Sequence, residues 1–262
     1  RQVPHVLSGP VVADSLVVEC ALHLDRPFPL AVNSSMRVAQ TGSFRQSDGG
    51  VSVGTLASNA GPIEVVGSSA GFSVLGDLAV GTTGRLVQSD GVIQVLGDAA
   101  FSGIQTMTSG TLILHSNFSL VANGDNQVMA GSLPHVTQFI GDARAVRELR
   151  WNSPPSGSTF GQLQFSATEP GGFVFATDSA AATVTAMHAV VAPQVLLTVP
   201  GGQGPRFTFL LGGLQGNGLE ILDQARIDNQ GSIVVSGTQG LSCFDVLQVL
   251  GLILGPFECR SP

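Results

Sequence analysis

The sequence predicts an all-β protein, a single-stranded parallel β-solenoid with coils of about 21 residues. Two segments repeat at a fixed interval, short runs of alternating apolar and polar residues recur between turns, and the composition disfavours amphipathic helices. A β-sandwich also alternates strands with turns and is the alternative fold. The fixed interval favours the solenoid.

The repeat joins residues 34–53 and 76–95, which share eight identities at an offset of 42. Half of this interval is also present, because the SVLGD of residues 73–77 is echoed by the QVLGD of residues 94–98. A coil of this length cannot bury its apolar side alone, but coils stacked about 4.8 Å apart share a continuous core. The 42-residue offset therefore corresponds to two coils.

Both repeats contain the sequence QSDG, which we interpret as a corner of the coil. Asp48-Gly49 and Asp90-Gly91 occupy equivalent places in the two repeats. Glycine adopts a positive φ without steric cost, and aspartate accepts hydrogen bonds from nearby backbone in turns. These four residues are predicted structural turns, repeated because successive coils must turn at the same place.

The composition limits both the fold and the partners. Charged residues make up only 11% of the chain, lysine is absent, and long helices would lack the charged residues for their wet faces. The net charge of −7 argues against nucleic acid as a partner. No apolar run reaches the roughly 18 residues of a membrane-spanning helix, so no membrane span is expected.

We expect one solenoid domain over residues 1–262, in which residues 141–160 interrupt the pattern. Within this segment, residues 142–151 form either a helical turn capped by Asp142 or a strand that carries Leu149 and Trp151 inward. The domain is divided into an N-terminal segment (1–33), regular coils (34–140), a lateral excursion (141–160), less regular coils (161–240) and an apolar C-terminal segment (241–262).

Three segments carry a resemblance to a known family: residues 71–101 (GFSVLGDLAVGTTGRLVQSDGVIQVLGDAAF), residues 118–131 (FSLVANGDNQVMAG) and residues 160–178 (FGQLQFSATEPGGFVFATD). They resemble the repeats of secreted bacterial parallel β-helix proteins of the adhesin, hemagglutinin-like or surface-fibre type. The resemblance implies a right-handed parallel β-helix, an extracellular or cell-surface location, and a structural or adhesive role. It implies no catalytic residues.

Asp77 and Asp98 are one period apart, so they would stack about 4.8 Å from each other in adjacent coils. Two such carboxylates would bind a cation such as calcium, share a proton, or turn away into solvent. We interpret them as solvated turn aspartates, with a metal site as the alternative. No cofactor is predicted.

Three cysteines occur, Cys20, Cys243 and Cys259. The last two enclose a short C-terminal loop and are predicted to form a disulfide if the protein is exported. The other pairings, or a link between two subunits through the odd cysteine, stay open.

Arg144, Arg147 and Arg150 place three of the eleven basic residues within seven positions. They form either a solvated strip or a contact patch that docks on the acidic flank of a neighbouring copy or on an anionic glycan.

The sequence favours a structural subunit of an extracellular filament or surface layer, built from copies of itself joined head to tail. Apolar runs near both ends, in residues 6–24 and 241–257, suit the stacking of solenoid ends. An adhesin or a carbohydrate-binding stalk that binds surface glycans is the alternative, although one Trp and no Tyr leave few stacking platforms. A polysaccharide lyase or hydrolase is a second alternative. We predict no enzyme, because the chain has no lysine or tyrosine and its acids are scattered.

Overall fold

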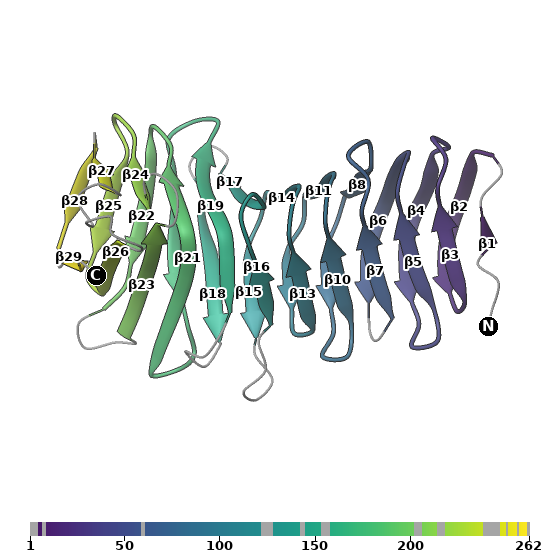
Figure 1. Cartoon of the computed structure of the whole chain (residues 1–262), viewed down its shortest axis with the longest axis horizontal. Helices are drawn as coiled ribbons and strands as arrows, with labels where there is room; N and C mark the ends of the chain where they lie inside the picture. The colour runs from purple at the N-terminus through teal and green to yellow at the C-terminus, as the bar shows by residue number, and fades with distance from the viewer. Residues whose placement is uncertain are drawn as a thin grey trace.

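A computed structural model of the chain describes residues 5–6, 9–58, 61–121, 128–141, 145–152, 158–201, 206–213, 218–237, 247–249, 251–255 and 257–260. The secondary structure in these residues consists of 29 β-strands. They stack along one long axis, with the two ends of the chain at opposite ends of the stack (Figure 1). Neighbouring strands pair in parallel, from coil to coil. The predicted parallel β-solenoid is therefore confirmed.

The strands form three ladders, which we name face 1, face 2 and face 3 in chain order. Face 1 begins the coil. Its strands are β1 (His5–Val6), β3 (Ala21–Leu24), β5 (Ser43–Gln46), β7 (Pro62–Val65), β10 (Arg85–Gln88), β13 (Ile104–Met107), β16 (Met129–Gly131), the first parts of β19 (Thr159–Ala167) and β21 (Ala181–Val191), β23 (Arg206–Gly213), β26 (Ser232–Gly237) and β29 (Phe257–Arg260).

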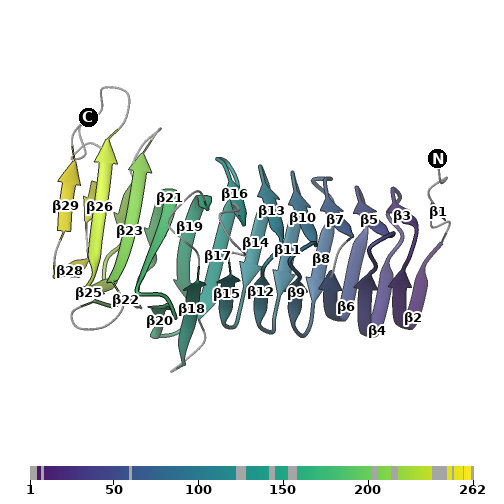
Figure 2. The same ribbon diagram turned by 90° about the horizontal axis from the view of Figure 1, so that it is seen from below.

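Face 2 follows face 1 along the chain, and face 3 completes the coil (Figure 2). Face 2 contains the first parts of β2 (Val11–Val18), β4 (Leu30–Val38) and β6 (Gly50–Ser58), then β8 (Gly71–Val74), β11 (Val92–Val95), β14 (Thr111–Leu114), β17 (Val136–Gly141), the second parts of β19 and β21, β24 (Leu219–Ile221) and β27 (Leu247–Val249). Face 3 contains the second parts of β2, β4 and β6, then β9 (Leu78–Val80), β12 (Ala99–Phe101), β15 (Phe118–Val121), β18 (Val146–Asn152), β20 (Gly171–Ala176), β22 (Val195–Val199), β25 (Arg226–Asn229) and β28 (Leu252–Leu254).

The register explains the 42-residue repeat. Phe44 pairs with Ile63, and Ile63 pairs with Leu86, so the two repeats lie two rungs apart on the same ladder. Between Val11 and Phe118, paired residues in adjacent coils are 19–23 positions apart in the sequence. In the later coils this offset grows to 24–31. The predicted period of about 21 residues thus describes the first half of the stack.

We predicted that residues 141–160 leave the stack, and this prediction is wrong for residues 146–152. Residues 146–152 form strand β18, in which Leu149 pairs with Phe118 of the coil before and Phe175 of the coil after. Leu149 and Trp151 are buried, as in the strand interpretation, because their alternation matches the inward side of the ladder. Asp142 lies outside the described residues.

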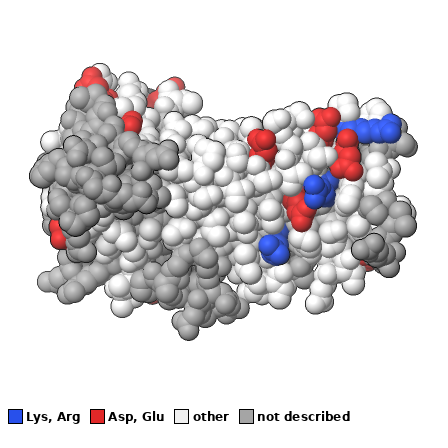
Figure 3. All heavy atoms as spheres, in the orientation of Figure 1, with Lys and Arg blue, Asp and Glu red and all other residues white. Residues whose placement is uncertain are grey.

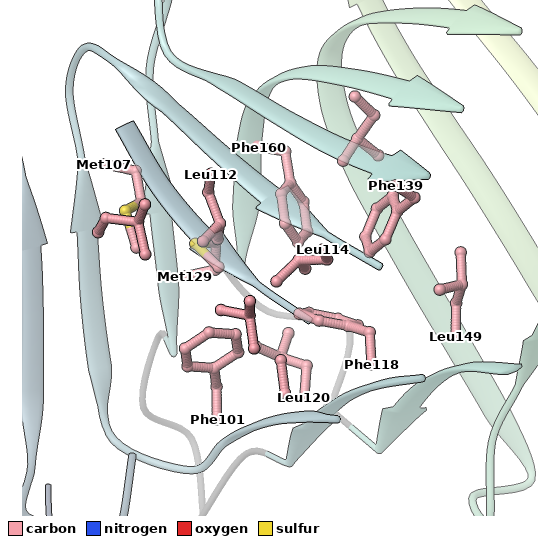
Figure 4. Close-up of a cluster of buried hydrophobic side chains, with 14 of the residues drawn as sticks. Phe101, Met107, Leu112, Leu114, Phe118, Leu120, Met129, Phe139, Leu149 and Phe160 are labelled. Carbon is pink, nitrogen blue, oxygen red and sulfur yellow. The ribbon is translucent and has the colours of Figure 1, made fainter. Parts of the chain in front are cut away.

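The core is a continuous column of apolar side chains inside the coils. Its contents change along the axis, because most of the large buried aromatic residues lie between Phe101 and Phe209. The rings of Phe118 and Phe139 lie 5.4 Å apart between centroids (Figure 4). The ring of Trp151 lies 4.9 Å from that of Phe118. Aromatic rings from successive coils therefore fill the interior where the coils are longest.

No helix that could cross a membrane occurs in the part of the chain described above.

Candidate functional site: corners, ladder ends and surfaces

The structure places the QSDG residues at the corner between faces 1 and 2. Gly49 and Gly91 have φ angles of 76° and 74°, and a Cβ on Gly91 would lie 2.5 Å from the carbonyl oxygen of Ala70. The Asp48 carboxylate accepts a hydrogen bond from the Gly49 N–H at 2.7 Å, and Asp90 accepts one from the Gly91 N–H at 2.8 Å. Each aspartate therefore holds the glycine that follows it in the turn.

The glutamine of each QSDG sequence lies inside the corner, a role that the sequence analysis missed. Gln88 is fully buried, and its Nε2 donates to the carbonyl oxygens of Gly91 and Thr111, at 3.0 Å each. Its Oε1 lies 3.1 Å from Nε2 of His135, which is 1% exposed. Because Oε1 can only accept, the proton of this contact belongs to His135. The repetition of glutamine at residues 46 and 88 was the available signal, whereas nothing in the sequence marked His135.

Burial lowers the pKa of His135 from 6.5 to about 4. The imidazole is therefore neutral at pH 7, and the hydrogen bond to Gln88 places its proton on Nε2.

Asp77 and Asp98 belong to adjacent coils, at the corner that precedes β9 and β12. The Asp77 carboxylate accepts a hydrogen bond from the Asp98 N–H at 2.9 Å. The Asp98 carboxylate in turn accepts from the Asn117 N–H at 3.1 Å and from the Ser116 hydroxyl at 2.6 Å. The carboxylates thus hold the backbone of the next coil. Among the described residues, no group of three or more His, Cys, Asp or Glu is placed to hold a metal ion.

The three arginines do not share one environment. Arg144 lies outside the described residues, and Arg147 is half-buried. Arg150 pairs with Glu148, at 2.6 Å between Nη2 and Oε1, and with Asp178. Hydrogen bonds to Glu148 and Asp178 raise the pKa of Arg150, and hydrogen bonds from Asn152 and Arg150 lower the pKa of Asp178. The charge of Arg150 is therefore balanced within the fold.

A hollow of about 510 Å³ on face 3 brings Asp98 and Arg150 together. Asn117, Ser119 and Glu148 also contribute to its wall. Four of its charged or amide groups are bonded to one another in pairs: Asp98 with Asn117, and Glu148 with Arg150. The hollow can accommodate a small polar molecule, and the ion pair gives it no free cation.

The predicted disulfide involves Cys243, which lies outside the described residues, and it stays a prediction. Cys20 is a free thiol and is half-buried.

Both ends of the stack present unpaired strand edges in the described part of the chain. At the N-terminal end, β2 pairs with β4 on one side, and its Val12 and Val17 side chains are 74% and 49% exposed. At the C-terminal end, β27, β28 and β29 pair with β24, β25 and β26, and their outer edges have no described partner. Leu252 of β28 is 49% exposed. Backbone donors and acceptors on such edges can pair with another chain.

From Gly50 to Ser166, none of the described residues on the outward side of face 2 is Asp, Glu, Lys or Arg. We call this surface the uncharged face. Its residues are Gly50, Ser52, Gly54, Gly71, Ser73, Leu75, Val92, Gln94, Leu96, Thr111, Ile113, His115, Val136, Gln138, Ile140, Gln162, Gln164 and Ser166. Face 1 differs, because its outward row includes Arg45 and Glu64, 3.3 Å apart. Figure 3 shows charged side chains gathered over the N-terminal coils on the side that it draws.

The fold agrees with the resemblance to secreted parallel β-helix proteins, and the agreement is limited to the fold. Comparison of the chain with models of protein families, with curated proteins and with solved structures finds no match.

Proposed function

We propose that the chain is a structural subunit of an extracellular filament or surface layer, in which copies join head to tail through the ends of the solenoid. The observation that carries this proposal is the pair of open ladder ends, the outer edge of β2 and the outer edges of β27, β28 and β29. Unpaired edges of this kind are templates for strand addition.

The two ends have matching layouts. The last coil ends in β29 on face 1, β27 on face 2 and β28 on face 3. The first coil offers β1 on face 1 and β2 across faces 2 and 3. A second copy shifted along the axis keeps the direction of its strands, so every new pairing is parallel, as in the rest of the stack. Such a heterologous contact propagates as a filament when it does not close into a ring.

The exposed side chains at the ends favour association. Val12, Val17 and Leu252 lie at the two ends and expose between 49% and 74% of their surface. These side chains point outward, so a coil stacked on the end would cover part of their apolar surface, worth about 25 cal/mol per Å² of covered area. The backbone groups of the edges would exchange water for ladder hydrogen bonds at the same time.

Substitution of both exposed valines at the N-terminal end, Val12→Asp with Val17→Asp, is expected to abolish filaments. The carboxylates would lie on the outward rows of the terminal coil, beside exposed apolar residues of the joined copy such as Leu252, and would lose part of their hydration. The measurement is negative-stain microscopy with light scattering over a range of protein concentrations. Ala79→Asp is the matched control, because Ala79 belongs to the same outward row of face 3 as Val17, in the middle of the stack.

We expect the Ala79→Asp protein to form filaments like the unmodified chain. If the unmodified chain stays monodisperse and short at every concentration, the proposed head-to-tail assembly is wrong.

A carbohydrate-binding stalk of the adhesin type is the second candidate, and the polar hollow beside Arg150 favours it. Binding of neutral oligosaccharides by the monomer, lost on filling the hollow by Ser119→Trp, would support this function. An array of glycans without a hit would remove it.

A further inference from the structure

We infer that the uncharged face is a docking surface for a second copy of this chain, which packs its own uncharged face against it. This inference is separate from the head-to-tail assembly, because it concerns the side of the solenoid and uses none of its end strands.

The sheet under the uncharged face has the properties of one that is covered. Parallel sheets usually have both of their sides buried, whereas here the outward side of β8, β11, β14 and β17 lies on the surface. Leu75, Val92 and Leu96 are 56%, 42% and 43% exposed on adjacent coils. Contiguous apolar exposure of this kind marks interaction sites.

The polar side chains of the uncharged face are prepared for burial. Gln94 Nε2 donates to Nε2 of His115 in the next coil at 2.9 Å, and Gln138 Nε2 donates to the Ser166 hydroxyl at 3.3 Å. These bonds run along the stack and lie within the face. A partner can therefore cover these two amides with one N–H of each already bonded, which lowers the cost of burying them.

A second copy is the occupant that fits this surface. The uncharged face is flat and regular, and it needs a partner that is also flat and carries no charge at its centre. The same face of another copy meets both conditions through a two-fold axis. If face 1 were the contact instead, the ion pair of Arg45 and Glu64 would be buried in the interface. Both charged groups would lose water, and this desolvation is costly.

The area of the uncharged face suits a weak dimer. Three outward residues per coil span about 15 Å, and six coils at about 4.8 Å each span about 29 Å. These two lengths bound a flat rectangle on each copy, and protruding side chains add to its surface. The two faces together would therefore bury about 1,000 Å². This value is near the lower limit of stable interfaces, so the dimer should depend on protein concentration.

The rims of the uncharged face are acidic. Asp48 and Asp90 lie at the corner toward face 1, and Asp77 and Asp98 lie at the corner toward face 3. In the dimer the two packed sheets would lie about 10 Å apart, so the acidic rims of the two copies would face each other at about this distance. Added salt screens charges at this distance, because the Debye length is about 10 Å at 0.1 M. Dimerisation should therefore strengthen as the salt concentration rises from about 20 mM to 300 mM.

The experiment uses the full chain with Val12→Asp and Val17→Asp, so that end-to-end joining does not contribute. Sedimentation equilibrium of this parent should show a monomer–dimer equilibrium. Ile113→Arg places a charge near the centre of the uncharged face and should raise the dissociation constant at least tenfold. Thr106→Arg is the matched control, since it changes an outward residue of the same coil on face 1, and it should leave the constant unchanged.

A charge-swap mixture distinguishes a lost contact from a damaged fold. Ile113→Arg and Ile113→Asp proteins should each be monomeric, and mixed in equal amounts they should form a heterodimer. A parent that stays monomeric at high salt, or a mixture that does not associate, would overturn the inference. Filaments formed by the chain with Ile113→Arg and intact ends would still support head-to-tail assembly, so the two proposals fail separately.

Discussion

Replacing Gly91 by valine is expected to lower the free energy of unfolding by about 3 kcal/mol. Gly91 has a φ of 74°, where a β-branched residue is strained by about 1–2 kcal/mol. The new Cβ would also lie 2.5 Å from the carbonyl oxygen of Ala70 and 2.6 Å from that of Gly67, so the backbone of the coil below must shift. Chemical denaturation monitored by circular dichroism measures the loss.

Gly71→Val is the matched control for this substitution. Gly71 pairs with Val92 of the next coil, and a Cβ at this position would meet no atom within 4 Å. Valine is favoured in strands, so its free energy of unfolding should change by less than about 0.5 kcal/mol. If Gly91→Val loses no more stability than this control, the corner tolerates a side chain and its glycine is dispensable.

Lowering the pH from 6.5 to 4 is expected to remove about 3 kcal/mol of stability through His135 alone. The pKa of His135 is lowered by burial from 6.5 to about 4, so the unfolded chain takes up the proton first as the pH falls. The contribution of neutral His135 is complete above pH 6.5, is lost progressively toward pH 4, and does not fall further below that pH. Each pKa unit corresponds to about 1.4 kcal/mol.

His135→Gln isolates this contribution from the titration of the carboxylates. Glutamine keeps a donor for the Oε1 of Gln88 but does not titrate. Subtracting the stability of the variant from that of the unmodified protein, between pH 4 and pH 7.5, should leave a slope that vanishes above pH 6.5. A flat difference across the whole range would show that His135 does not carry the pH dependence.

The sequence predicted those parts of the fold that repeat with a constant interval. Corners at Gly49 and Gly91 could be located, because an equal coil length puts equivalent residues in register. The same reasoning failed at residues 146–152, where the offset from Phe118 to Leu149 is 31 residues and no self-similarity marks the strand. Extra chain length between rungs hides a strand from repeat analysis, although the alternation of Leu149 and Trp151 was visible.

The surface was predicted less well than the ladder, for a physical reason. Whether Asp77 and Asp98 repel each other depends on which neighbour each carboxylate meets, and the structure gives each one a backbone N–H of the next coil. The partners of Arg150 come from its own strand and from Asp178 in the next coil, 28 residues further on. The uncharged face becomes visible only when the register is known, because its members are spread over more than 100 residues.

The unequal coil lengths also determine how this protein would respond to a pulling force. Its hydrogen bonds lie along the long axis, so tension between the termini would peel one turn at a time instead of shearing whole sheets. A turn of about 21 residues would release about 70 Å of chain, and a later turn of about 26 residues would release about 90 Å. The molecule would thus extend in steps of two sizes, and the step size would report which half had yielded.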